Sequence, residues 1–273
     1  MSGPTPAPHP PSGGERIAAA LRAPAARGEQ ALVAYITAGF PSPAGFRAQL
    51  ADVAGAADVV EIGVPFSDPM ADGVTIQRAS EQALRAGVSL RWILAQLAAR
   101  PAPAHDTPLL LMSYLNPLLA YGPGLAEEAA RAGICGLIVP DLPFDEGAEL
   151  AAALQGAGLA LVQMVTPVTP AARLVRVAAA SQGFVYAVTM TGTTGRSVAT
   201  GGEVADYLRR VRAAATVPVC AGFGIRTRAQ VEALRGLADG VIVGSALIEL
   251  LERGGSAREW LAALRSPGRA PST

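Results

Sequence analysis

The sequence predicts a single (β/α)8 barrel, and two observations carry that prediction. Eight short runs along the chain are nearly continuous in apolar residues, as strands covered on both faces are. Segments rich in Ala, Leu and Arg with a helical period separate these runs, and the β-then-α order is kept throughout. A doubly wound open sheet is the alternative that the pattern alone leaves open.

The elements follow in order along the chain. The strands are expected at 32–37, 58–63, 108–114, 135–140, 159–165, 184–189, 217–222 and 239–244. Among the segments between them, clear helical stretches lie at 43–56, 89–100, 147–158 and 228–238. We expect an extra N-terminal helix in GERIAAALRAPAARG, residues 14–28, which closes the bottom of the barrel.

No domain boundary is visible inside the helical and strand pattern, so one catalytic domain is expected over residues 14–265. Residues 1–13 are predicted to be a disordered Pro-rich tail, and residues 266–273 a disordered C-terminal tail. The first tail lacks the basic start and apolar middle of a signal peptide, and no apolar run is long enough to span a bilayer. We therefore expect a cytoplasmic protein without a membrane segment.

Composition excludes several kinds of chemistry. The formal net charge is zero and there is no basic run, which argues against a nucleic-acid-binding protein. All 22 basic residues are arginines, so Schiff-base chemistry, pyridoxal phosphate anchoring and a P-loop lysine are excluded. His9 and His105 are too few for a His-rich zinc site, so no metal is expected. Cys135 and Cys220 are expected as buried core thiols.

The stretch VVEIGVPFSDPMADG, residues 59–73, runs an apolar strand into a carboxylate. Active sites of such barrels lie where strands end. Alternation places Glu61 on the same strand face as Val59 and Gly63. If that face points inward, desolvation raises the pKa of Glu61, which suits a group that both donates and accepts protons. The alternative is a salt bridge between Glu61 and an arginine at a neighbouring strand end.

Two more acids, Asp68 and Asp72, follow in the segment PFSDPMADG. Both are ordinary turn residues, which is the alternative to a functional role. Two separated carboxylates in different environments can also divide acid and base tasks. Aromatic residues at or near strand ends are expected to wall a flat apolar pocket or to fill the core: Tyr35, Tyr114, Tyr186 and Phe223.

Glycine-rich segments follow the last three expected strands, at 190–202, 221–230 and 243–251. In barrels of this kind, the loops after the late strands and a short helix N-terminus often cradle a phosphate. Backbone amides then supply the donors without any lysine, whereas plain tight turns are the alternative. The first of these segments is long and rich in Thr and Gly, which is typical of a lid.

Taken together, these motifs resemble the tryptophan synthase α-subunit family. EIGVPFSDPMADG is similar to its signature, and LLLMSYLNPLLAYG, LIVPDLP, GTTG, GFGI and VGSA resemble family blocks in the same order, over residues 15–265. The resemblance implies a TIM barrel that cleaves indole-3-glycerol phosphate to indole and glyceraldehyde 3-phosphate. It also implies a β-subunit partner in an α-β-β-α heterotetramer. That partner carries its own pyridoxal phosphate, so no cofactor is expected on this chain.

The resemblance further implies roles for individual residues. Glu61 matches the family's acid/base, and Asp72 matches the group that engages the indole nitrogen. Thr194 matches a threonine on the closing loop that meets Asp72, while Asp68 and Pro69 match the loop that faces the partner. Positions around the substrate and its phosphate are matched by Tyr35, Met112, Tyr114, Tyr186, Gly195, Phe223, Gly224, Gly244 and Ser245.

Three residues depart from the family pattern. Phe40 stands where many members have an acid, Val74 replaces a frequent proline, and Thr193 replaces the usual valine. We expect these departures to touch the partner side and loop dynamics rather than the two carboxylates. Other readings remain open: a sugar-phosphate isomerase on the same kind of barrel, a free-standing indole-releasing lyase, and a non-catalytic subunit that only activates its partner.

Overall fold

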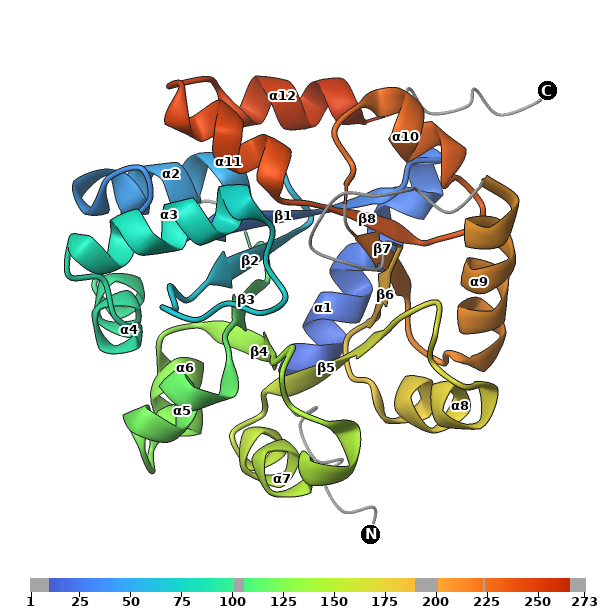
Figure 1. Ribbon diagram of the computed structural model, residues 1–273, viewed down its shortest axis with the longest axis horizontal. Helices are drawn as coiled ribbons and strands as arrows, with labels where there is room; N and C mark the ends of the chain where they lie inside the picture. Colours follow the sequence, from blue (N-terminus) through green and yellow to red (C-terminus); the bar gives the residue numbers. More distant parts are fainter. Residues whose placement is uncertain (1–9, 101–105, 190–200, 223, 266–273) are drawn as a thin grey trace, which may run out of the picture.

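The computed structural model describes residues 10–100, 106–189, 201–222 and 224–265. Within them, eight parallel strands close into a barrel in which each strand pairs with the next and β8 pairs with β1 (Figure 1). The predicted (β/α)8 barrel is confirmed, the open-sheet alternative is wrong, and every strand ends within two residues of its expected bounds. The strands are β1 (Ala31–Thr37), β2 (Val59–Gly63), β3 (Leu109–Met112), β4 (Ile134–Ile138), β5 (Ala160–Val165), β6 (Val185–Val188), β7 (Val219–Gly222) and β8 (Gly240–Val243).

Helices surround the ring of strands (Figure 1). Each of the four clear helical stretches contains a helix, namely α2, α4, α7 and α10. The outer α-helices are α2 (Phe46–Ala54), α3 (Val74–Arg85), α4 (Leu90–Ala98), α5 (Leu115–Tyr121), α6 (Leu125–Arg131), α7 (Ala148–Gly156), α8 (Ala171–Ala180), α9 (Gly201–Ala214), α10 (Arg228–Ala233), α11 (Ser245–Glu252) and α12 (Ala257–Leu264). Short 3-10 turns are η1 (Ala23–Arg27), η2 (Pro43–Gly45) and η3 (Phe144–Glu146). None of the helices in the described ranges is long and apolar enough to cross a membrane.

The remaining helix, α1 (Gly13–Arg22), crosses the centre of the ring at the end where the strands begin (Figure 1). Ser12 caps it, because the Ser12 hydroxyl accepts the Glu15 N–H while the Glu15 carboxylate accepts the Ser12 N–H. Ile17 and Leu21 are buried in the cluster that fills the barrel. The expected closure of the barrel bottom by an extra helix is therefore confirmed.

The bounds of this N-terminal region differ slightly from expectation. The helix begins at Gly13, one residue inside the expected tail, because Ser12 rather than a later residue provides the cap. It ends at Arg22, and the turn η1 follows, because Pro24 lacks the N–H needed to extend an α-helix. Of the expected tails, residues 10–12 are described, and residues 1–9 and 266–273 lie outside the described residues.

Side chains alternate along the strands, so the barrel has two apolar layers. On β1, Ala34 faces outward into the cluster formed with the surrounding helices, and Tyr35 faces inward. On β2, Val60 and Ile62 face outward in the same way, and Val59 lies in the interior cluster. Side chains at inward-facing positions near the strand ends therefore all point into the same end of the barrel interior.

Phe40 contradicts one expectation. Its side chain is fully buried in the interior cluster, so it presents no surface to a partner. An apolar side chain at this turn packs inward, whereas an acid would have stayed in water. Val74 is 77% exposed, and Thr193 lies outside the described residues. Cys135 and Cys220 are buried free thiols, as expected.

A matched pair of glycine substitutions tests how α1 docks. A Cβ atom on Gly13 would lie 1.9 Å from the carbonyl oxygen of Cys135, whereas the nearest atom to a Cβ on Gly14 lies at 3.4 Å. We expect Gly13→Ala to lower the free energy of unfolding by about 1–3 kcal/mol, because the backbone has to shift. Gly14→Ala is the control and should change it much less. Equal losses for both variants in urea unfolding would contradict this account of the docking.

Candidate active site

Glu61 lies near the end of β2 with its side chain inside the barrel, where it is fully buried. Among the described residues, neither carboxyl oxygen of Glu61 has a hydrogen-bond partner, and no arginine forms the salt bridge considered as the alternative. Burial raises the pKa of Glu61 to about 8, because an ionised carboxylate loses its hydration there. The predicted inward orientation and raised pKa are both confirmed.

Tyr35 is the neighbour of Glu61 across the β1–β2 register. Its ring extends over Gly63, where an added Cβ atom would lie 2.1 Å from the tyrosine oxygen. The Tyr35 hydroxyl lies 3.4 Å from the hydroxyl of the buried Thr37. Gly63 is therefore required for space, and it lets an aromatic ring lie next to the carboxyl of Glu61.

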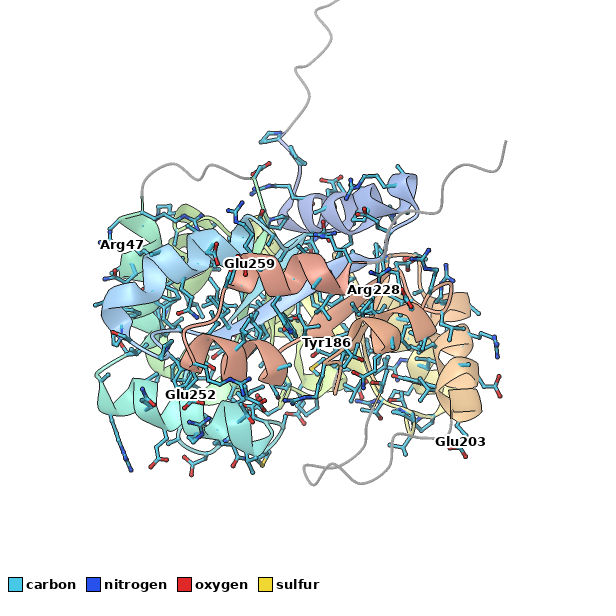
Figure 2. All side chains as sticks on the ribbon, turned by 90° about the horizontal axis from the view of Figure 1, so that it is seen from above. Arg47, Tyr186, Glu203, Arg228, Glu252 and Glu259 are labelled. Carbon is cyan, nitrogen blue, oxygen red and sulfur yellow. The ribbon has the colours of Figure 1, made fainter. Side chains whose placement is uncertain are left out.

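Tyr186 repeats this arrangement on the other side of the barrel. It lies on β6 inside the barrel (Figure 2), and a Cβ atom on Gly222 would lie 2.7 Å from its ring. Burial raises the pKa of Tyr186 well above its usual value, and the charges of Glu61 and Asp72 add to the effect. Burial raises the pKa of Tyr35 in the same way, with Asp72 and Glu61 again contributing. Both carboxylates therefore lie close enough to the two tyrosines to affect them electrostatically.

Asp72 lies on the loop after β2 and is 7% exposed. The Tyr114 hydroxyl donates to Asp72 Oδ2 at 3.1 Å and accepts the Ala71 N–H at 2.9 Å. Burial raises the pKa of Asp72, and the Tyr114 hydrogen bond partly offsets this. Asp72 thus has a polar partner that Glu61 lacks, so the two acids sit in different environments.

Tyr114 does not belong to the strand in which the sequence placed it. β3 ends at Met112, and Tyr114 precedes α5, which it enters in an extended conformation. This turn directs its ring toward the β2 loop, where it stacks on Phe66 with ring centroids 5.0 Å apart. Met112, 8% exposed, belongs to the interior cluster beside the site and pairs with Gly63 across the β2–β3 register.

Two residues of this loop region were missed by the sequence analysis. Phe66 supports the ring of Tyr114, and the Gln77 side chain donates to the carbonyl oxygen of Asp72 at 2.8 Å. Phe66 lies inside the signature segment, and its aromatic character was the available signal. Gln77 gave no signal, because a glutamine in the first turn of a helix is most often a solvated side chain.

Gly224 and Gly244 follow the adjacent strands β7 and β8, and Ser245 begins α11. Gly224 has φ +78°, a conformation that favours glycine, and its carbonyl oxygen accepts from the Gln230 side chain at 3.2 Å. Gly244 precedes α11, which begins at Ser245, so the first N–H groups of that helix point toward the rim. Unbonded N–H groups at a helix start are suited to an anion.

Three predicted site residues, Thr194, Gly195 and Phe223, lie outside the described residues. Asp68 is exposed and Pro69 half-buried on the loop before Asp72, away from the barrel interior. In the parts of the chain that the structure describes, no group of three or more His, Cys, Asp or Glu side chains is arranged to hold a metal ion. The arrangement offers two buried acids near two buried tyrosine rings, and the start of α11 lies at the end of the adjacent strand β8.

Comparison with known proteins gives matches to the family that the sequence motifs resemble. The family model described as tryptophan synthase alpha chain matches residues 21–266. The tryptophan synthase alpha chain of Nitratidesulfovibrio vulgaris strain DP4 is 46% identical over 251 residues, which is 91% of this chain and 97% of the relative. That of Novosphingobium aromaticivorans is 44% identical over 233 residues, 85% of this chain and 88% of the relative.

Solved structures are similar over the same extent. Tryptophan synthase from M. tuberculosis in its aminoacrylate-bound form superposes with a TM-score of 0.82 and 35% identity, covering 93% of this chain and 99% of that one. Tryptophan synthase subunit alpha from Legionella pneumophila strain Paris superposes with a TM-score of 0.79 and 32% identity, covering 91% and 95%.

Glu61→Gln tests the burial of the carboxyl through stability. The pKa of Glu61 is about 8 in the folded chain, above the ordinary value of 4.5. Between those values the folded state holds a proton that the unfolded state has released, so the stability contribution is present at low pH and is lost as pH rises. Glutamine cannot ionise, so the variant should gain stability relative to the parent across this window, by up to about 1.4 kcal/mol per pH unit.

The measurement is urea unfolding of parent and variant at several pH values within that window. Glu203→Gln is the control, because Glu203 is exposed at the start of α9 (Figure 2) and its carboxyl meets water in both states. A stability difference between Glu61→Gln and the parent that stays constant with pH would mean that Glu61 is not desolvated.

Proposed function

This chain belongs to the tryptophan synthase alpha chain family, and from that premise we propose that Glu61 and Asp72 carry its chemistry. The chain is a carbon–carbon lyase of tryptophan biosynthesis, which cleaves indole-3-glycerol phosphate to indole and glyceraldehyde 3-phosphate. The observation that supports these two roles most directly is the Glu61 carboxyl, which is buried without a hydrogen-bond partner among the described residues.

The reaction is a retro-aldol cleavage in which Glu61 acts first as an acid. Its pKa of about 8 keeps most of the carboxyl protonated at neutral pH. The protonated carboxyl delivers its proton to C3 of the indole ring, which leaves a positive charge on the ring nitrogen. Asp72, as a carboxylate, stabilises that charge by accepting the ring N–H. Tyr114 holds Asp72 Oδ2 in place for this task.

Glu61 then acts as a base. Having lost its proton to C3, the carboxylate accepts the proton of the hydroxyl on the side-chain carbon attached to C3. The oxygen forms the aldehyde carbonyl as the carbon–carbon bond breaks, and the bonding electrons return to the ring to restore indole. One proton enters and one leaves through the same carboxyl, so Glu61 ends the cycle as it began.

No imine takes part, which agrees with a chain that contains no lysine. We propose that the α reaction uses no cofactor, and that pyridoxal phosphate resides on the β subunit. Tyr35 and Tyr186 supply the flat walls for the indole ring, with Met112 beside them. A pocket of this kind keeps water away from the carboxyl and so maintains its raised pKa.

The phosphate group is assigned to the rim beyond β7 and β8. We propose that backbone N–H groups around Gly224, Gly244 and Ser245 bind it, with the start of α11 adding a favourable dipole. Gly195 is assigned to the same cradle, Phe223 to the wall of the pocket, and Thr194 to a closing loop that meets Asp72, all by family resemblance. Because a phosphate dianion does not cross a bilayer unaided, we place the reaction in the cytoplasm.

Family membership implies a β-subunit partner. We propose an α-β-β-α heterotetramer in which Asp68 and Pro69 face that partner. Apolar side chains flank them on the surface, since Met70 is 75% exposed and Val74 is 77% exposed. Among the described residues, two of the five exposed large apolar side chains lie on this segment, which supports its use as a surface that a second protein covers.

Glu61→Gln tests the acid/base role. The amide keeps the shape of the side chain but has no exchangeable acid proton, so kcat should fall by the roughly 10²–10⁴-fold typical of a general acid–base group. KM should change little, because the pocket is intact. Steady-state cleavage of indole-3-glycerol phosphate is the measurement, with Asp72→Asn alongside. Near-normal turnover by Glu61→Gln would show that another group moves the protons.

Gly244→Ala tests the phosphate cradle. A Cβ atom there meets Tyr35 at 3.5 Å, an ordinary contact, so the fold tolerates it while the methyl group narrows the rim. We expect kcat/KM for indole-3-glycerol phosphate to fall at least roughly tenfold (about 1.4 kcal/mol), with little change for the dephosphorylated substrate. Gly156→Ala, on α7 with open space around its Cβ, is the control. Equal kcat/KM values for both substrates in the parent would exclude the cradle.

A further inference from the structure

We propose that Gln77 is a positioning residue that transmits docking of the β subunit to Asp72. The inference rests on the proposed function, and it adds the contact through which the surface and the catalytic carboxylate communicate. Gln77 lies on α3, and its side chain binds the main chain of the loop that runs from Asp68 to Asp72.

The geometry is that of one amide holding two carbonyl groups. Gln77 Nε2 donates to the carbonyl oxygen of Asp72 at 2.8 Å and to that of Pro69 at 3.4 Å. A primary amide has two N–H groups, so both bonds form at once. Pro69 follows the exposed Asp68, and Asp72 ends the same short loop. The two ends of the loop are therefore tied through a single nitrogen atom.

Gln77 itself sits on a rigid support. It lies in the first turn of α3, where its own N–H binds the carbonyl oxygen of Gly73 at 3.0 Å. α3 is joined to the neighbouring α11 by the Thr75 hydroxyl, which donates to Glu249 at 3.3 Å, and by an ion pair of Arg78 with Glu252 (Figures 1 and 2). The amide is thus mounted on a helix that is held to the helix at the proposed phosphate site.

The loop has a second anchor on the opposite side. Tyr114, at the start of α5, donates to the Asp72 carboxylate and accepts the Ala71 N–H. Tyr114 fixes the carboxylate, and Gln77 fixes the main chain that carries it. Displacement of Pro69 by a docked partner changes the longer of the two Gln77 bonds first. The same amide then shifts the Asp72 main chain, and with it the angle at which the carboxylate meets the ring nitrogen.

Gln77→Leu removes both bonds while keeping a side chain of similar size. The readout is the activation ratio, meaning kcat of the chain saturated with purified β subunit divided by kcat of the chain alone. We expect a ratio of up to ~100 for the parent and below ~10 for Gln77→Leu. Gln82→Leu is the matched control, because Gln82 lies on the same helix and donates to the Pro41 carbonyl at 2.9 Å, away from the loop. It should keep the parent ratio.

The activation ratios distinguish the role of Gln77 from the partner proposal and from the proposed function. If Gln77→Leu lowers both kcat values by the same factor, its role is purely structural and this inference is wrong, although the proposed function stands. If the parent itself is not activated while the β subunit binds, both the partner proposal and this inference fail. Gln77→Glu serves as a second variant that places an acceptor against both carbonyls. It should lose activation too, with thermal unfolding and β-subunit titration confirming that each variant is folded and binds.

Discussion

Glu61 meets Tyr35 on one neighbouring strand and Leu110 on the other because eight parallel strands pair in one closed barrel. Closure leaves each inward position at a fixed height, and every strand ends at the same rim. The carboxyl therefore has aromatic and aliphatic neighbours imposed on it by pairing at the backbone level. A shift of one residue in β2 would turn Glu61 outward and put Ile62 in its place. The chemistry of the site therefore depends on the register of β2, which keeps Glu61 pointing inward.

Burial raises the pKa of both acids placed by the same strand–loop unit, but their surroundings differ in polar partners. Glu61 has no polar partner among the described residues and is kept mostly protonated, whereas Asp72 has the Tyr114 hydroxyl and the loop backbone around it. The difference arises because one acid lies on the strand and the other on the loop. Glycines at positions 63 and 222 complete the arrangement by making room for the two tyrosine rings. A side chain at either position would collide with one of these rings.

The sequence predicted whatever depends on local periodicity. Apolar runs located the strands within two residues, and alternation predicted that Glu61 points inward. Contacts between loops were beyond reach, because the turn of Tyr114 toward Asp72 depends on where β3 ends. Phe40 lies in the core rather than on the partner side, because its apolar side chain packs inward where an acid would stay in water. The roles of Thr194, Gly195 and Phe223 stay predictions.

The helix α1 makes the two ends of the barrel different, because it closes only the end where the strands begin. α1 and the side chains of Ile17 and Leu21 seal the end where the strands begin, below layers of buried residues. We therefore expect a small apolar product formed beside Glu61 to leave at the opposite end of the barrel, where the strands end and the 68–72 loop lies. By closing one end of the barrel, α1 determines the side on which the product is expected to leave, although it lies at the end away from the proposed active site.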